Sequence, residues 1–223
     1  LRFNDIANVG VTGRHLSSFT MAGQHSFNAG KEKGAYWKDE CLQLNFDYLT
    51  KEMRIPKDEI TYAEDLWHMP DFSAFGPSIE SFSGGLELVN SVFMQYRATP
   101  TGFEELDMKV IDVGWGFERL PWFKNGTASA YDSILASELA FMKKKASFKV
   151  EQELFERYSK LSAKLDVEQA INLRQEKEKI AKALGITLEE MEETIAPLQG
   201  MYAVADHART LLFALTDGAL PSN

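Results

Sequence analysis

The sequence predicts an α+β fold in its first part and an all-α second part, with a boundary near residue 143. Strand-like and helical segments are mixed before that boundary, whereas apolar residues recur at helical spacing after Lys143–Lys145. The hydrophobic fraction of 44% over 223 residues supports a packed core. We therefore expect one domain at residues 1–142 and a second at residues 143–223.

The first part is expected to contain strands and two helices. Segments that alternate in polarity or lack a helical period predict strands at 17–28, 59–64, 85–98 and 108–114. Apolar spacing predicts helices at 36–53, closed by Pro56, and at 127–142, with Thr127 as the N-cap. Residues 1–19 predict two strands around a glycine-containing loop. Residues 64–85 are rich in Gly, Pro and Ser and predict a long functional loop.

The second part is expected to be a series of helices. Apolar residues at helical spacing predict the first of them, namely Val150, Leu154, Tyr158, Leu161 and Leu165. Asp166 with Gln169 predicts the start of the next helix, and Gly185 its end. Thr187 with Glu190 opens a short helix that Pro197 is expected to end, before a last apolar helix at 198–216.

Composition excludes several classes of protein. A net charge of −9 argues against sequence-independent binding to a polyanion such as DNA. No apolar run approaches the ~18–20 residues that a membrane span needs. The single cysteine, Cys41, excludes an intramolecular disulfide and favours a reducing, cytoplasmic setting, and its apolar context predicts a buried side chain. The N-terminus lacks a start methionine and signal-peptide features, so we expect an internal fragment.

Charged residues cluster in the first 19 residues. Arg2, Asp5, Arg14 and His15 surround a loop with two glycines, and this pattern has two interpretations. It is typical of a β-hairpin with a solvated turn. It also fits a hairpin that binds phosphate, because arginine offers bidentate, permanently charged donors. Phe19 on the return strand is either a core residue or a surface for stacking a base.

A second polar stretch, "VIDVGWGFERLPW", places Asp112 at a strand end, followed by Gly114, Gly116 and Arg119. A lone Gly-x-Gly is weak evidence, and the third glycine of a Rossmann fingerprint is missing. Glu80 and Glu87 are candidate Mg²⁺ ligands, although surface carboxylates are far commoner than metal ligands. The run Lys143–Lys145 is either a solvated face or a set of phosphate contacts.

Two of these patterns resemble the signature motifs of class II aminoacyl-tRNA synthetases. Arg2…Asp5…His15-Leu-Ser-Ser-Phe19 resembles the second motif of that class, and Gly114-Trp-Gly-Phe-Glu-Arg119 resembles the third. More narrowly, "FMQY", "DVGWGFER" and "DGALPSN" in combination resemble the alanyl-tRNA synthetase family of the archaeal type. The resemblance implies an antiparallel β-sheet flanked by helices, followed by a helical tRNA-recognition domain. The family's first motif and its editing and C-terminal domains are expected outside residues 1–223.

The resemblance implies a site for ATP. Arg2 would hold the α-phosphate, Arg119 the γ-phosphate, and Arg14 with His15 would assist at the β- and γ-phosphates. Phe19 or Met21 would lie against adenine, and Gly114 and Gly116 would leave room for the nucleotide. Asp5 belongs to the same motif. Glu80, and less directly Glu118, would bind Mg²⁺ or order the site.

The resemblance also implies sites for L-alanine and for the acceptor stem of tRNA(Ala). Asp112 would pair with the ammonium group of alanine, Trp67 and Val89 would wall a methyl-sized pocket, and Asn90 would hydrogen-bond the substrate. Gly114 would border the same pocket. Such a pocket rejects serine only weakly, by roughly 10²-fold, and glycine even less. Asn223 would contact the minor groove of the acceptor stem.

Three functions remain open on the sequence alone. The chain is an alanine-activating ligase, a catalytically inactive RNA-binding or regulatory paralogue, or an ATP-binding piece that is inactive because it is truncated. The presence of Arg2, Asp112 and Arg119 favours the first.

Overall fold

The computed structural model describes residues 1–148, 151–163, 165–167 and 169–220. The chain forms two compact units. We call Thr20–Lys124 the sheet unit, and Leu1–Phe19 together with Asn125–Asn223 the helical unit. The predicted boundary at 142/143 differs from this division. The difference arises because Val9 and the helices after residue 129 share one hydrophobic core with the C-terminal helices.

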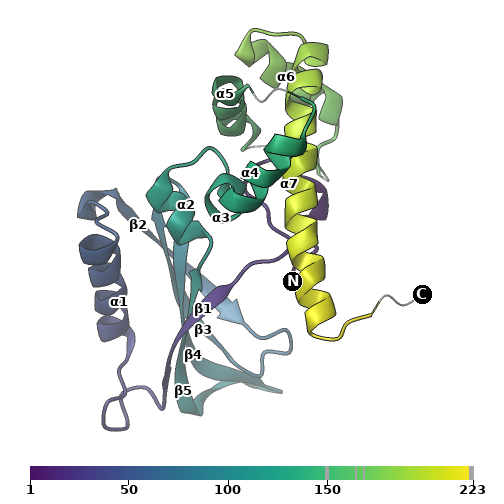
Figure 1. Ribbon diagram of the computed structural model, residues 1–223. Helices are drawn as coiled ribbons and strands as arrows, with labels where there is room; N and C mark the ends of the chain where they lie inside the picture. Colours follow the sequence, from purple (N-terminus) through teal and green to yellow (C-terminus); the bar gives the residue numbers. More distant parts are fainter. Residues whose placement is uncertain (149–150, 164, 168, 221–223) are drawn as a thin grey trace. The chain divides into compact units, whose positions relative to one another are not determined.

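The sheet unit contains a five-stranded sheet in which every neighbouring pair is antiparallel (Figure 1). Its strands are β1 (Met21–Phe27), β2 (Ile60–His68), β3 (Phe75–Ser83), β4 (Leu86–Thr99) and β5 (Gly102–Gly116). Their order across the sheet is β1-β5-β4-β3-β2. The expected antiparallel α+β architecture is therefore confirmed.

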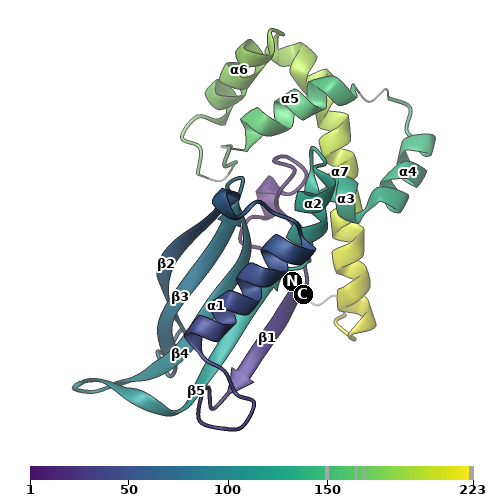
Figure 2. The same ribbon diagram turned by 90° about the vertical axis from the view of Figure 1, so that its left-hand side faces the viewer.

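One face of the sheet is covered by α1 (Lys38–Asp47), which continues as a π-helical turn, Tyr48–Glu52 (Figures 1 and 2). Cys41 and Leu49 from this helical segment pack with buried residues of β4 and β5, namely Val89, Phe93, Ile111 and Val113. The Asn45 side chain donates a hydrogen bond of 2.9 Å to Ser91 Oγ. Because side chains alternate across a strand, Asn90 and Asp112 lie on the other face.

Two segments differ from the expected structure. Residues 64–85 are mostly the paired strands β2 and β3 instead of a loop. Their buried positions include Ser78, Ser81 and Ser83, so a hydrophobicity pattern could not reveal the strand. Residues 1–19 contain no strand; they form turns and a short 3₁₀ helix, Ile6–Asn8.

The helical unit contains five α-helices in the part of the chain described. They are α3 (Ala130–Ile134), α4 (Ala136–Lys145), α5 (Gln152–Ser162), α6 (Leu173–Leu184) and α7 (Leu188–Thr216). Tyr131, Leu139, Phe155 and Tyr202 are among the fully buried residues of their core. The predicted helix at 127–142 is two helices, and Ser129 caps the first in place of Thr127.

The predicted helix ends are partly confirmed. Gly185 ends α6 with φ of +80°, and Thr187 with Glu190 forms a complete capping box at the start of α7. Asp166 does accept from the Gln169 amide, but α6 begins later, after Asn172. Pro197 lies inside α7 and does not end it, because the packed face of the helix continues past it through Leu198 and Tyr202.

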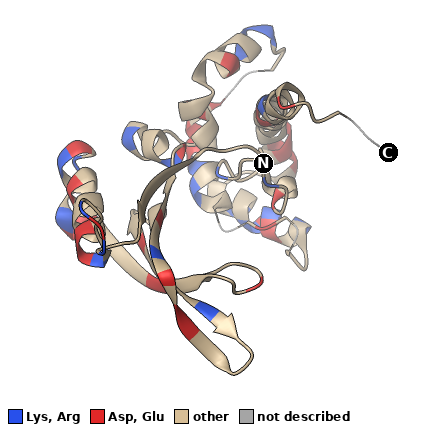
Figure 3. Cartoon of the chain, turned by 90° about the horizontal axis from the view of Figure 1, so that it is seen from below, with Lys and Arg blue, Asp and Glu red and all other residues tan. Residues whose placement is uncertain are grey.

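Positively and negatively charged residues are interspersed in both units (Figure 3). None of the helices that the structure describes is long and apolar enough to cross a membrane.

Candidate functional site

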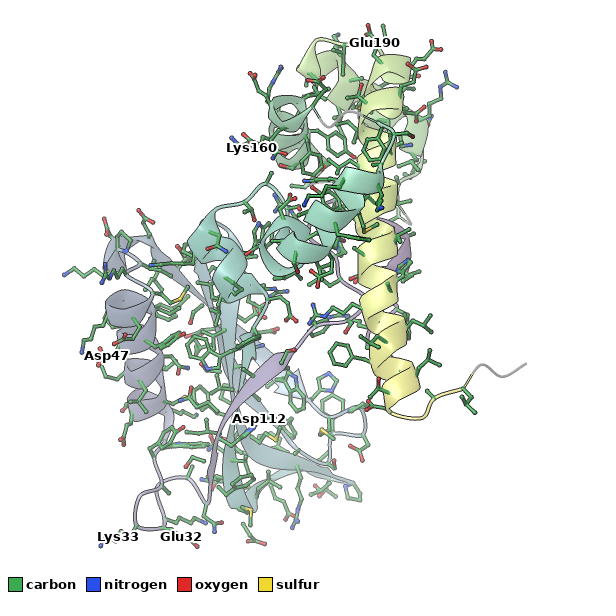
Figure 4. The ribbon with its side chains drawn as sticks, in the orientation of Figure 1. Glu32, Lys33, Asp47, Asp112, Lys160 and Glu190 are labelled. Carbon is green, nitrogen blue, oxygen red and sulfur yellow. The ribbon has the colours of Figure 1, made fainter. Side chains whose placement is uncertain are left out.

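The sheet face away from α1 carries most of the residues predicted to bind alanine. Asn90 on β4 lies directly opposite both Gly114 on β5 and Glu80 on β3. Asp112 lies two residues before Gly114 and therefore on the same face. Figure 4 shows Asp112 beside β1. Trp67 reaches this face from β2. Ala63 of that strand lies opposite Glu80, and Trp67, four residues later, is on the same side of the strand. The structure thus brings four of the predicted alanine contacts onto one surface, namely Trp67, Asn90, Asp112 and Gly114.

Asp112 has a partner that the sequence did not predict. His25 on β1 lies opposite Asp112, and its Nδ1 is 3.0 Å from Asp112 Oδ1. The imidazole also lies across Gly23, where an added Cβ would be 2.3 Å from His25 Nε2. The alternation of β1 gives the only sequence signal, since it places Met21, Gly23 and His25 on one face.

Val89 does not lie on this face. Its side chain is fully buried between the sheet and α1, and it lies opposite Trp115, whose ring meets that of Tyr48. Val92 is the apolar β4 residue on the other side, directly opposite Asp112. Val89 therefore does not share a face with Asn90 and Asp112, as the predicted pocket would require.

Asn90 contributes a polar atom suited to a ligand. Its Oδ1 is buried and has no hydrogen-bond partner among the residues described. Leaving such an acceptor unpaired costs about 1–3 kcal/mol. The cost is recovered when a donor binds, so Asn90 is a candidate substrate contact.

Glu80 lies among other acids on this surface. Burial, together with the charges of Glu87 and Asp65, raises the pKa of its carboxyl, while Arg119 opposes the shift. The local potential is negative and therefore attracts a cation. No group of three or more His, Cys, Asp or Glu residues in the described ranges could hold a metal ion by itself.

The two glycines of the "GWGFER" stretch let other side chains approach the backbone. A Cβ on Gly114 would lie 2.8 Å from Met21 Sδ, and one on Gly116 would lie 2.8 Å from Arg119 Cδ. Arg119 is held by Glu87, with 2.8 Å between Nη1 and Oε2 and 3.1 Å to the Glu87 carbonyl oxygen. Arg119 is also the first residue of α2 (Arg119–Asn125), a helix that the sequence did not predict.

Glu118 orders the chain. Its carboxylate is buried and accepts hydrogen bonds from the Thr20 amide at 3.0 and 2.9 Å. The Phe117 amide donates to the Thr20 carbonyl at 3.2 Å. These contacts tie the start of β1 to the end of β5. They fit the ordering role expected for Glu118 better than a metal-binding role.

The residues of the other motif lie in the helical unit. The side chains of Arg2 and Arg14 are exposed, and Asp5 precedes the 3₁₀ helix without capping it through its side chain. His15 Nδ1 shares a 2.7 Å hydrogen bond with Thr12 Oγ1. Phe19 is partly buried. The predicted ATP residues thus fall into two sets, one in each unit.

Side chains of the helical unit fix the backbone of residues 1–19. Tyr131 OH accepts from the Gly10 amide at 2.8 Å and donates to the His15 carbonyl. Tyr158 OH donates to the Val11 carbonyl at 3.3 Å. Burial raises the pKa of the Tyr158 hydroxyl to about 12 and that of Tyr131 further still, so both remain neutral donors at neutral pH. The predicted tRNA contact, Asn223, lies outside the described residues.

Similarity to known proteins identifies the family of this chain. A family model described as tRNA synthetases class II (A) matches residues 1–223. The chain is 44% identical over 223 residues to an alanine--tRNA ligase of Nitrosopumilus maritimus, 42% over 224 residues to one of Methanocella arvoryzae and 37% over 237 residues to one of Thermococcus kodakarensis. Each match covers 100% of this chain but only 24%, 25% and 26% of the relative.

The chain therefore spans about a quarter of the length of the curated relatives that it matches. The family match covers every residue, and the sheet is antiparallel throughout with the third motif at the end of β5. On this evidence the chain belongs to the class II tRNA synthetases.

Proposed function

We propose that this chain is the central catalytic region of an alanine--tRNA ligase, which activates L-alanine with ATP and transfers it to the 3′ end of tRNA(Ala). One observation carries the proposal. Asp112, Asn90 and Gly114 lie together on one face of the sheet of a class II synthetase. The names of the archaeal relatives support alanine as the amino acid.

The proposed reaction has two steps. A carboxylate oxygen of alanine attacks the α-phosphorus of ATP, and the bond to the β-phosphate oxygen breaks and releases pyrophosphate. A hydroxyl of the terminal ribose of the tRNA then attacks the alanyl carbonyl, and AMP leaves. Neither step needs a protein nucleophile, so catalysis consists of positioning and stabilisation of phosphate charge.

Asp112 is proposed to bind the ammonium group of alanine. His25 contacts its Oδ1, which leaves Oδ2 to accept from the substrate. The Asn90 Oδ1 atom, which is buried without a partner among the described residues, would accept a further hydrogen bond. Trp67 and Val92 are proposed as the walls around the methyl group.

The residues proposed to bind ATP are those of the two motifs. In the sheet unit, Arg119 would take the γ-phosphate, since its five N–H donors allow it to keep Glu87 as a partner. In the helical unit, Arg2, Arg14 and His15 would bind the remaining phosphate oxygens. Phe19 or Met21 would contact adenine.

Mg²⁺ is proposed as the accompanying cation. Mg²⁺ commonly binds one or two carboxylates together with substrate phosphates, and this arrangement fits Glu80 in its acidic surroundings. When bound, the ion would neutralise phosphate charge. The cytoplasmic location, the acceptor-stem contact of Asn223 and the functional division at residue 142 also remain proposals.

The test is alanine-dependent exchange of labelled pyrophosphate into ATP, measured with the full-length protein that contains these residues. We expect exchange with alanine and none when alanine is omitted or replaced by leucine. Absence of exchange would refute the ligase proposal. If the inactive protein still bound tRNA(Ala), the RNA-binding paralogue would be supported. Activity in the full-length protein but not in residues 1–223 would show that this piece alone is insufficient.

A further inference from the structure

A buried carboxylate in the helical unit has no role in the proposed chemistry. Asp206 on α7 is 1% exposed. Both of its oxygens lie 3.2 Å from the Ser17 amide nitrogen, and Oδ2 also accepts from the Ser17 hydroxyl. His207 Nδ1 is 3.3 Å from Oδ2. Ser17 is therefore the main partner of this charge, through its backbone and its side chain.

A second residue of α7 completes this contact. Thr210 lies four residues after Asp206 and hence on the same side of the helix. Its Oγ1 is 2.7 Å from Ser17 Oγ. The helix itself is held in the core by Leu198, Met201 and Tyr202. A rigid element thus fixes Ser17 at two points.

Ser17 lies in a segment that is proposed to bind ATP. It follows Arg14 and His15 and precedes Phe19, the three residues of this segment with proposed ATP contacts. This segment forms no strand, so no ladder of backbone hydrogen bonds sets its course. Isolated contacts hold it instead. They include the backbone hydrogen bond from the Arg2 amide to the Ser17 carbonyl oxygen at 3.0 Å and the side-chain contacts that Asp206 and Tyr131 make with Ser17 and His15.

A buried carboxylate adds little net stability, because the cost of its desolvation offsets most of the energy gained from its hydrogen bonds. It does restrict the local conformation, since its oxygens must stay close to their hydrogen-bond donors. We infer that Asp206 is a positioning residue for ATP binding: by holding Ser17 it sets the orientation of Arg14, His15 and Phe19. The inference rests on the proposed ATP-binding role of this segment. It also means that ATP use depends on α7, which the sequence assigned to tRNA recognition.

The test compares variants of the full-length protein by two measurements. The first is the affinity for ATP, measured directly by calorimetric titration without alanine. The second is the KM for each substrate in pyrophosphate exchange. For Asp206→Asn we expect ATP affinity to fall about tenfold and the KM for ATP to rise equally, since a charge-assisted hydrogen bond is weakened. The KM for alanine should stay within about twofold, because Asp112 and Asn90 lie in the other unit.

Ile195→Val is the matched control. Ile195 is a buried residue of the same helix, and its side chain cannot hydrogen-bond. The substitution should therefore lower stability without changing the hydrogen bonds of Ser17. Thr210→Val removes the second contact and should weaken ATP binding in the same direction but less. Ser17→Ala combined with Asp206→Asn should cost less than the sum of the two, because both remove one shared contact.

Two outcomes would overturn the inference. In the first, Asp206→Asn lowers the melting temperature as Ile195→Val does but leaves ATP affinity unchanged. In the second, the KM values for alanine and for ATP rise together, which would indicate a general loss of structure. Failure of the proposed function can be told apart from failure of this inference. If the proposed function is wrong, the unmodified protein shows no alanine-dependent exchange, but its ATP affinity can still be compared with that of the variants.

Discussion

At the scale of single residues, Asp112, the proposed contact for the ammonium group of alanine, already has a partner in the protein. A carboxylate that faces a small substrate needs a fixed direction, and the His25 ring supplies it from the neighbouring strand at 3.0 Å. The ring is able to lie there because the preceding β1 position on the same face is Gly23, where a Cβ would be 2.3 Å from His25 Nε2. One oxygen is used for this contact, and the other can meet the ammonium group.

We predict that Asp112→Ala weakens alanine binding by about 100-fold or more, because it removes one member of a charge pair. ATP affinity should be unchanged. Asp107→Ala is the control, since Asp107 lies on the same strand but is exposed and distant in register from Asn90. Titration of alanine and ATP separately checks this. Unchanged alanine affinity would place the amino-acid site elsewhere.

Cys41 illustrates the effect of burial on a titrating group. Desolvation raises the pKa of its thiol from 9.0 to about 11, although a hydrogen bond with Ser91 opposes the shift. The folded protein therefore holds this proton more tightly than the unfolded chain. The resulting stabilisation is complete below pH 9 and is lost as pH rises from 9 toward 11.

We predict that Cys41 resists iodoacetamide at pH 8 in the folded protein and reacts once the protein is unfolded. Between pH 9 and 11 the free energy of unfolding should fall by up to about 3 kcal/mol more in the natural protein than in Cys41→Ala. Denaturant titration at several pH values measures this difference. Identical pH dependences for the two proteins would contradict the assignment.

At the scale of elements, patterns with a local cause were predictable from the sequence. The capping box of Thr187 and the C-cap of Gly185 depend on neighbouring residues alone, and both are confirmed. β3 was not predictable, because its buried positions are serines whose burial depends on neighbouring strands. Pro197 was misjudged because tertiary packing on both sides keeps the helix continuous.

The candidate site followed the same division. The roles proposed for Asp112 and Arg119 follow from the resemblance of their segment to a class II synthetase motif. The partner of Asp112 was not, since His25 is far from it in sequence and meets it only through the β1–β5 register. Val89 was placed on the wrong side because a buried strand with apolar residues on both faces does not reveal which side a residue occupies.

We predict opposite effects for two glycines near Gln199. Gly200 lies inside α7 with open space around an added Cβ, so Gly200→Ala should raise the free energy of unfolding by about 0.5–1 kcal/mol. Gly10 has φ of +81°, and its Cβ would lie 2.5 Å from the Gln199 carbonyl oxygen. Gly10→Ala should therefore destabilise the protein, by more than about 1 kcal/mol. Thermal unfolding of both variants tests this prediction. It would be contradicted if both substitutions raised, or both lowered, the free energy of unfolding.

At the scale of the whole molecule, the chain leaves the helical unit after Phe19 and returns to it at Asn125. The first 19 residues contribute Val9 to the helical core and backbone partners to Tyr131, Tyr158 and Asp206. The sheet unit, by contrast, is one continuous segment. The motif that the sequence joined to the first domain is therefore structurally part of the helices.

We predict that residues 125–223 do not fold cooperatively without residues 1–19. In their absence Asp206 loses Ser17, and removing the partner of a buried charge costs about 3–5 kcal/mol. Joining residues 1–19 to residue 125 through a flexible glycine–serine linker should restore a cooperative thermal transition. The same fusion carrying Asp206→Ala should melt at a lower temperature. A cooperative transition at the same temperature with and without residues 1–19 would mean that the segment lies on the helices without stabilising them.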